Sequence, residues 1–418
     1  MMMGAVTMKR WRLGALAAVV AVLAGCNAPR GPEPGIVNEP PPPPDTLRPT
    51  AAAPVMPAPV MDTLGRPVSS DQTQVAILLP LSGPNAQVGH GLLRAAELAL
   101  FDVGNRQVTL LPFDTQGHSL GAEASARAAV AANADVILGP LFGNNVPAVA
   151  RVAGSTADPA PIISFTTTTD AAGGLVRVIG LVPQTEIETI ADYALAQGMT
   201  RFAALAPDNA YGRIAVSTLT DRLLAQGGFL DFVEFYAQDG STLREATASL
   251  AARAAGPGGP LVDAVLIPDI GVNLRTAVPL LVAGGMGRAQ LLGTGLWDRP
   301  GIGTDEALHG GWFAAPDPSN RTAFQQGYEQ TFGQTPIRIG TVAYDAAALA
   351  AALASLGGPI DPFGPESLSD PNGFVGTDGV FRFDDAGVVE RRLAILEITR
   401  EGPVVREPAA LSFGSAEF

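Results

Sequence analysis

The sequence predicts an α/β protein built from two doubly wound parallel sheets, and three observations lead to this prediction. From residue 73 onward, short apolar runs alternate with segments whose apolar residues recur at helical spacing. The apolar runs are nearly continuous, as expected of strands that are covered on both faces of a parallel sheet. The alternation then begins again near residue 201, so a second series of elements follows the first. Two series of this size indicate two lobes.

Each series is predicted from the order of its apolar runs and helical segments. The first contains strands at 75–79, 108–111, 136–138 and 161–165, with helices at 89–100, 119–132 and 145–153. The second contains strands at 201–206, 228–236, 264–267 and 290–293, with helices at 211–226 and 241–255.

The N-terminus has the features of an export signal. Lys9, Arg10 and Arg12 are followed by an apolar run at 13–25, which is too short to span a bilayer. The run ends in Leu-Ala-Gly-Cys, which resembles the bacterial lipobox. The resemblance implies cleavage after residue 25 and lipid attachment at Cys26. The alternative is an ordinary signal peptide with a chance cysteine.

A proline-rich segment follows the predicted lipid site. Residues 26–72 include five consecutive prolines at 40–44 and show no amphipathic period. Such a composition favours a disordered, largely polyproline-II chain. About 45 residues of it would reach roughly 100–140 Å at ~3.1 Å per residue. We therefore expect a tether between the membrane and the folded part.

The net charge argues against nucleic acid as a partner. The chain has 26 basic and 40 acidic residues, a formal charge of −14. Three of the basic residues lie in the signal, so cleavage would leave 23 against 40, or −17. Such a surface repels nucleic acid and anionic headgroups. We expect contact with the membrane through the lipid anchor only.

Several kinds of chemistry are also excluded. Cys26 is the only cysteine and Lys9 the only lysine, so the processed chain has neither a free thiol nor an amine side chain. This excludes disulfides, thiol catalysis, phosphate-loop NTPases and Schiff-base enzymes. His90, His118 and His309 are isolated in the sequence, and no serine-hydrolase elbow occurs. We therefore predict no metal, no cofactor and no enzymatic activity.

Polar loops at predicted strand ends are the candidate binding sites, because ligands of open α/β sheets bind beyond the carboxyl ends of the strands. The loops at 80–84, 139–145 and 166–170 carry hydroxyls and amides and lead towards helices. They could hold a carboxylate or a similar polar group. The alternative is that they only cap helices and complete turns.

Four sequence blocks in order resemble type I periplasmic binding proteins: VAILLPLSGPNAQVGHGLLRAAELAL, VILGPLFGNNVPAVA, PIISFTTTTD and APDNAYGRIAVSTL. The resemblance implies two Rossmann-like lobes, joined by three crossovers, with a ligand cleft between them. It implies a first lobe of 73–183 plus 310–372, a second of 184–309 plus 373–405, and a tail of 406–418. The residues that it places at the cleft are Ser82, Asn144, Thr166, Thr168 and Tyr211.

One position departs from the amino-acid binders of this family. They use an acidic residue of the second lobe to pair the ligand ammonium, and the matching residue here is Gly295. The role is unfilled unless Asp298 or Asp269 substitutes for it. Trp297 is a further cleft candidate, although a core role is at least as plausible for this residue.

A narrower resemblance concerns the penicillin-binding-protein activator lipoproteins. It rests on the lipobox, the tether, LPLSGP, GPLFGNNV, LVPQTEIE, LAPDNAYG and the segment GFVGTDGVFRFDDAGVVERRLAILEI. It implies an outer-membrane lipoprotein that contacts a peptidoglycan synthase. Known members carry an additional N-terminal helical-repeat domain, where this chain has the tether. The alternative is the substrate-binding lipoprotein of an ABC importer, with a permease as partner and an amino acid, amide or similar small polar solute as ligand.

Overall fold

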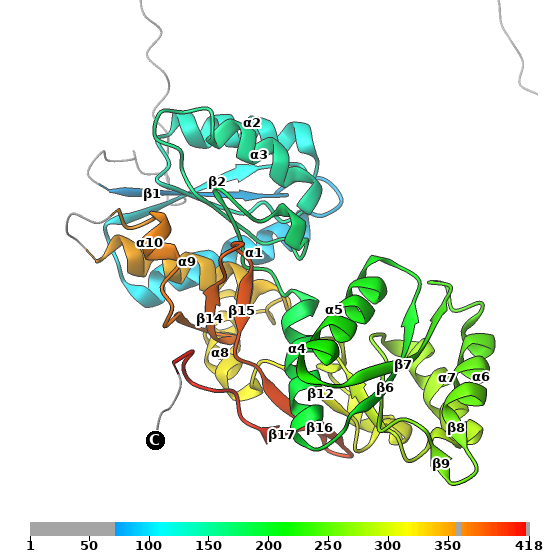
Figure 1. Cartoon of the computed structure of the whole chain (residues 1–418). Helices are drawn as coiled ribbons and strands as arrows, with labels where there is room; N and C mark the ends of the chain where they lie inside the picture. The colour runs from blue at the N-terminus through cyan, green and yellow to red at the C-terminus, as the bar shows by residue number, and fades with distance from the viewer. Residues whose placement is uncertain (1–71, 357–360, 415–418) are drawn as a thin grey trace, which may run out of the picture. The chain divides into compact units, whose positions relative to one another are not determined.

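The computed structural model describes residues 72–356 and 361–414 (Figure 1). The predicted signal peptide, Cys26 and the predicted tether up to residue 71 lie outside the described residues. Within these ranges, no helix is long and apolar enough to cross a membrane.

The first sheet has five parallel strands in the order β2-β1-β3-β4-β5. Residues Val75–Leu79 of β1 have no solvent exposure, because helices cover both faces of the sheet. Helices α2 and α3 lie on one face, whereas α1 and α9 lie on the other (Figure 1). These elements are β1 (Thr73–Leu79), β2 (Val108–Asp114), β3 (Val136–Leu138), β4 (Ile162–Ser164), β5 (Val176–Val178), α1 (Ala86–Val103), α2 (Ser119–Ala131), α3 (Val146–Ala153) and α9 (Gly340–Ala354).

The second sheet has seven strands in the order β17-β16-β12-β11-β10-β6-β7. Five of them are parallel, and β16 and β17 extend one edge in antiparallel fashion. Alternate residues of β6 enter different cores: Phe202 packs with α4 and α5, whereas Ala203 packs with α6 and α7. These elements are β6 (Arg201–Pro207), β7 (Phe229–Tyr236), β10 (Ala264–Leu266), β11 (Gln290–Gly293), β12 (Trp312–Ala315), β16 (Ala394–Thr399), β17 (Gly402–Glu407), α4 (Pro183–Ala196), α5 (Ala210–Gln226), α6 (Leu243–Ala254) and α7 (Gly271–Leu281).

Local capping signals explain where several helices begin and end. The Asn209 side chain accepts a hydrogen bond from the backbone N–H of Gly212 at 2.9 Å and so starts α5. Gly227 ends the same helix in the left-handed conformation, with φ of 83°. In α2, the His118 ring nitrogen Nδ1 accepts from Gly121 at 3.0 Å, so this histidine has a structural role as a cap.

A small antiparallel sheet, β13-β14-β15, packs on the core of the first sheet through Phe381, Phe383 and Val389. The chain passes between the core of the first sheet and the cores of the second sheet three times: after β5, after β12 and after β15. The remaining elements are α8 (Pro318–Phe332), α10 (Pro365–Leu368), β13 (Phe374–Gly376), β14 (Gly379–Phe383), β15 (Val389–Arg391), β8 (Ala255–Gly256), β9 (Gly259–Pro260), the π-helical turn η3 (Val282–Met286) and the 3-10 turns η1 (Gly143–Asn145), η2 (Thr169–Ala171), η4 (Gly295–Trp297), η5 (Ile302–Thr304) and η6 (Glu306–Leu308).

The predicted α/β class with doubly wound sheets is confirmed, but two segments lie in lobes other than those expected. Strand β12 pairs with β11 and β16 of the second sheet, although residues 310–317 were expected in the first lobe. Strands β13 to β15 pack on the first core, although residues from 373 were expected in the second lobe. Short apolar runs suit either sheet, so hydrogen-bond partners alone decide which sheet they join. Below, the first lobe is residues 72–182 and 316–392, and the second is 183–315 and 393–407.

Candidate functional site

Loops at the carboxyl ends of the first sheet carry four of the predicted site residues. Ser82 follows β1 and Asn144 follows β3, and both are exposed. Thr166 and Thr168 follow β4, and the Thr168 N–H donates to Thr166 Oγ1 at 3.1 Å. Gly143 lies directly against the hydroxyls of both threonines, so the loops after β3 and β4 touch. The structure thus brings these polar groups to one edge of the sheet, as the strand-end rule predicts.

Asp114, at the end of β2, fixes the loop that carries Ser82. One carboxylate oxygen accepts from the N–H groups of Leu81, Ser82 and Gln116 at 2.9, 3.2 and 2.8 Å. Burial acts to raise the pKa of Asp114, but the hydrogen bonds from Ser82, Gln116 and Leu81 outweigh it and lower the pKa. The carboxylate therefore stays ionised and serves as a structural acceptor.

At the second sheet, the predicted residues bond to one another and to their own lobe. The Tyr211 hydroxyl donates to Thr294 Oγ1 at 2.8 Å. The Asp269 carboxylate accepts from the Tyr236 hydroxyl and, at 2.9 Å, from the Asn273 amide. Its other oxygen accepts from the Ile270 N–H at 2.6 Å. The Tyr211 hydroxyl and the Asp269 carboxylate, which could bind a ligand at this edge, therefore already have partners within the chain.

Trp297 belongs to the core of the second lobe. Its ring has no solvent exposure and packs against Phe313 at 6.2 Å between centroids. The indole N–H donates to the backbone oxygen of Asp269 at 3.1 Å. Gly293 lies beneath the ring, and a Cβ at that position would come within 2.1 Å of it. Trp297 therefore has a core role in the structure and does not line a cleft.

A carboxyl group that the sequence did not single out occupies the space beside Gly295. Glu186, in the first turn of α4, accepts from the Gly295 N–H at 2.9 Å. A Cβ at Gly295 would lie 2.4 Å from the other oxygen of the same carboxyl. A larger side chain at position 295 would therefore require the Glu186 carboxyl to move. Burial raises its pKa to about 8, against the Gly295 hydrogen bond and the charge of Arg338.

Replacing Glu186 by glutamine is expected to remove part of the pH dependence of stability. Because the folded-state pKa of about 8 exceeds the ordinary value of 4.5, the native state binds the extra proton, and this stabilisation is lost as the pH rises through 8. We expect the wild type to lose about 1–3 kcal/mol more than the variant between about pH 5 and about pH 8.5. Glutamine retains an oxygen for Gly295.

Urea denaturation at the two pH values measures this difference. Glu245→Gln, on an exposed position of α6, is the matched control and should keep the wild-type pH dependence. An identical pH dependence in Glu186→Gln and in the wild type would show that the Glu186 carboxyl does not hold its proton in the folded state.

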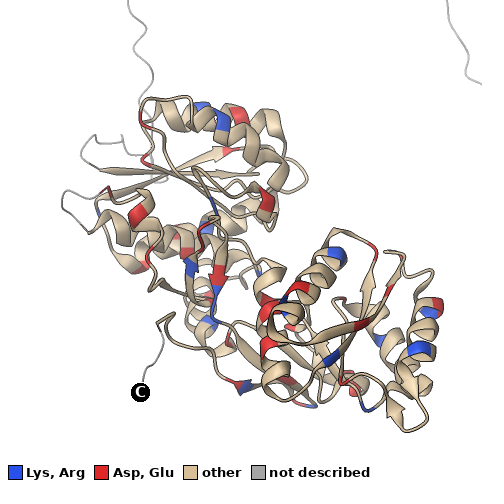
Figure 2. Cartoon of the chain, viewed as in Figure 1, with Lys and Arg blue, Asp and Glu red and all other residues tan. Residues whose placement is uncertain are grey.

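Asp298 joins the second lobe to charged residues of the first. Its carboxylate bonds to Arg321 at 2.6 Å and lies 4.0 Å from Arg338. Arg338 also pairs at 3.3 Å with the fully buried Asp378, which accepts from the Thr341 hydroxyl at 2.6 Å. Figure 2 shows acidic and basic residues gathered around β14, β15 and α8. Asp298 is therefore occupied as an ion-pair partner at the crossovers.

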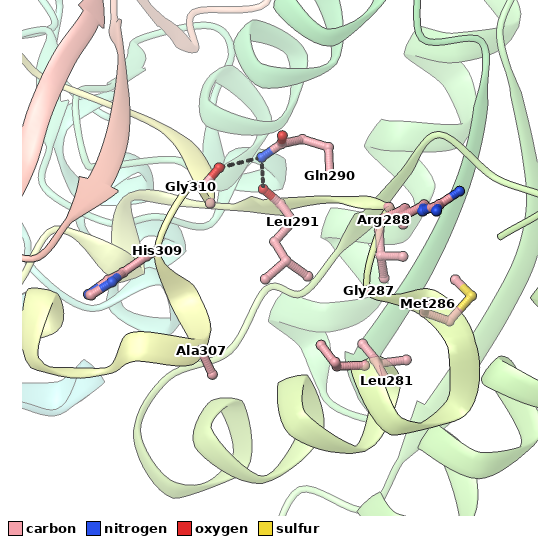
Figure 3. A pocket seen from close by; sticks show the side chains of 13 residues that line it. Leu281, Met286, Gly287, Arg288, Gln290, Leu291, Ala307, His309 and Gly310 are labelled. Atoms are coloured by element: carbon pink, nitrogen blue, oxygen red, sulfur yellow. Dashed lines mark hydrogen bonds between the residues drawn. The ribbon is translucent and has the colours of Figure 1, made fainter. Parts of the chain in front are cut away.

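A separate cavity of about 270 Å³ lies at the opposite, amino-terminal edge of the second sheet (Figure 3). Leu281 and Met286 line one side of it, and Gln290 bonds to the backbone oxygens of Gly310 and Leu291 at 2.7 and 3.1 Å. None of the predicted site residues lines this cavity. It is distinct from the strand-end site.

The sequence found the loops of the site but not all of its residues. Glu186 lies in the quoted block LVPQTEIE, and its position in the first turn of a helix was the one available signal. Arg321 and Arg338 lie outside every quoted block. Across the described residues, no group of three or more His, Cys, Asp and Glu side chains is arranged to hold a metal.

The fold and the strand-end loops define a two-lobed binding module. A family profile described as periplasmic binding protein matches residues 72–378, more than half of the chain. The chain therefore belongs to the periplasmic binding protein family, with the type I fold. No curated protein matches the sequence.

Solved structures with the same fold include both kinds of relative that the sequence resembles. A branched-chain amino acid ABC transporter protein from Rhodospirillum rubrum has a TM-score of 0.70 and 19% identity, covering 80% of this chain and 99% of that one. Full-length LpoA from Haemophilus influenzae has a TM-score of 0.63 and 17% identity, covering 80% and 59%. The LpoA C-domain, described as a regulator of PBP1A, has a TM-score of 0.61 and 17% identity, covering 80% and 100%.

Proposed function

We propose that this protein regulates a peptidoglycan synthase of the penicillin-binding-protein class through direct protein contact. The observation that carries the proposal is the engagement of Glu186 with Gly295. In the amino-acid binders that the sequence resembles, the residue at the position of Gly295 supplies the negative charge that pairs with the ligand ammonium. With a pKa of about 8, Glu186 is mostly neutral at pH 7 and is a poor partner for a cation.

Two further features support a regulator over a solute receptor. Asp298 and Asp269, the expected substitutes, are both engaged by donors of the chain itself. The Tyr211 hydroxyl likewise donates to Thr294. A ligand at this edge would have to break these bonds and replace them, which costs affinity. The similarity to the LpoA C-domain agrees with this proposal.

We also propose that the protein is anchored by lipid on Cys26 to the periplasmic face of the outer membrane. The lipobox indicates the lipid anchor. The residue after Cys26 is Asn27, in place of the aspartate that often retains lipoproteins at the inner membrane. Membrane fractionation tests the location. Recovery with the inner membrane would instead favour the importer receptor.

The second candidate is a receptor for a small polar solute in an ABC importer. It is favoured by the first lobe, where Ser82, Asn144 and Thr168 are exposed together at the sheet edge. A native-state ligand at a hundredfold excess over Kd would raise stability by about 2.7 kcal/mol. A panel of amino acids, amides and peptidoglycan fragments therefore separates this candidate through the melting temperature.

The deciding experiment measures glycan-strand synthesis by the purified synthase of the same bacterium, with and without the full chain. The proposal predicts faster synthesis and a saturable complex, together with no shift of the melting temperature across the panel. The receptor would replace the regulator if the protein has no effect on the synthase and one solute class raises its melting temperature. That rise should be lost in Thr168→Ala and kept in the loop control Thr156→Ala.

A further inference from the structure

The segment after β17 adds a non-covalent connection between the lobes to the three covalent crossovers. Strand β17 is the edge strand of the second sheet, and Ala409 just beyond it packs against the second-lobe core. Four residues later, Phe413 contacts three residues of the first lobe: Gly373, Arg382 of β14 and Arg392, which directly follows β15. Residues 408–414 therefore have one end on each lobe.

Phe413 lies in a socket that is built around its ring. The guanidinium carbons of Arg382 and Arg392 lie 4.4 and 4.5 Å from the ring centroid, which is cation–π geometry. Gly373 has a φ of 76°, and a Cβ there would lie 2.5 Å from the Phe381 backbone oxygen and 2.9 Å from the ring, so the backbone and the phenyl group both require glycine at this position.

The two arginines of the socket differ in their other contacts. Arg382 is held by Glu390 at 2.7 Å and by the backbone oxygen of Pro371 at 3.2 Å. The backbone N–H of Arg392 donates to Val380 at 2.9 Å, whereas its buried Nε has no hydrogen-bond partner in the described parts of the chain. The Phe413 ring thus faces a guanidinium whose Nε is not paired by the described residues.

We propose that residues 408–414 form a strap that restrains the lobes, with Phe413 as a releasable anchor. The three covalent crossovers permit the lobes to rotate, and hinge motions of this kind are typical of ligand-binding modules with two lobes. Rotation that moves β17 away from the small sheet would withdraw Phe413 from Arg382 and Arg392. The strap would act in the same way on a regulator and on a solute receptor.

The test measures the distance between spin labels on exposed positions of the two lobes. Leu120 on α2 and Leu224 on α5 are 79% and 66% exposed, so cysteines at these two positions can carry the labels. Cys26, the only native cysteine, is first replaced by serine. In the labelled full chain, Phe413→Ala is expected to increase the ratio of separated to close lobes on the order of tenfold. Arg392→Gln should shift the ratio in the same direction.

Two variants make the result specific. Leu411, in the same segment, is 88% exposed, so Leu411→Ala should leave the distance distribution unchanged. Phe413→Trp retains an aromatic face for the arginines and should also leave it unchanged. The strap is refuted if Phe413→Ala gives the distribution of Leu411→Ala while the melting temperature shows a folded protein. A shift in Phe413→Trp as large as that in Phe413→Ala would show that cation–π contact with an aromatic ring does not restrain the lobes.

Discussion

Replacing Arg391 by methionine is expected to lower the free energy of unfolding by about 3–5 kcal/mol. Arg391 and Asp345 form an ion pair at 3.4 Å with side chains only 4% and 1% exposed. Arg391 also donates to the backbone oxygen of Ile179 at 3.0 Å, next to the first crossover. Asp345 accepts from the Thr377 N–H at 2.6 Å. The variant would leave a buried carboxylate without its counter-charge.

The loss should depend on pH in a defined direction. Burial raises the pKa of Asp345 to about 6 even with Arg391 beside it, and removing the positive charge would raise the pKa further. Protonation then relieves the unpaired charge at low pH, so the defect should be smaller near pH 5 than near pH 8. Urea denaturation at both pH values measures it.

A double variant separates the lost pair from lost packing. Arg391→Met combined with Asp345→Leu removes both charges and should recover most of the stability, because an apolar pair needs no counter-charge. Arg127→Met, which removes an exposed ion pair with Glu123, should leave stability nearly unchanged. A double variant as unstable as Arg391→Met would show that packing of the arginine, and not its charge, stabilises this region.

Truncating Trp297 to alanine is expected to cost about 3–5 kcal/mol and to loosen the loop at 294–298. The ring fills the space above Gly293 and packs against Phe313, and its N–H satisfies the Asp269 backbone oxygen. Its removal leaves a cavity and an unpaired carbonyl. Urea denaturation measures the loss of stability, and hydrogen exchange of the Gly295 amide measures the loosening of the loop.

The neighbouring Leu296 is the matched control, because its side chain is 37% exposed. Leu296→Ala should cost less than about 1 kcal/mol and leave the protection of the Gly295 amide intact. Comparable losses in the two variants would mean that Trp297 does not hold this loop in place.

The sequence by itself determined the class of fold and the loops of the site. Strands such as 75–79 are nearly continuous apolar runs, and this local pattern is sufficient to predict a buried parallel strand. The loops that carry Ser82, Asn144 and Thr168 followed because parallel strands present their carboxyl ends at one edge. The resemblance to type I periplasmic binding proteins then pointed to these residues within the loops. The fold class and the loops use only neighbouring residues and a general rule of topology.

Only the tertiary structure decided which side chains meet across long stretches of chain. Glu186 and Gly295 are 109 positions apart, and no local pattern relates them. The burial of Trp297 depends on where Gly293 leaves room, and the sheet that β12 joins depends on its hydrogen-bond partners. Such contacts arise from the packing of complete elements, and packing is set by the shapes of both partners together. For this reason the strand-end loops were predictable, whereas the carboxyl group that closes the space beside Gly295 was not.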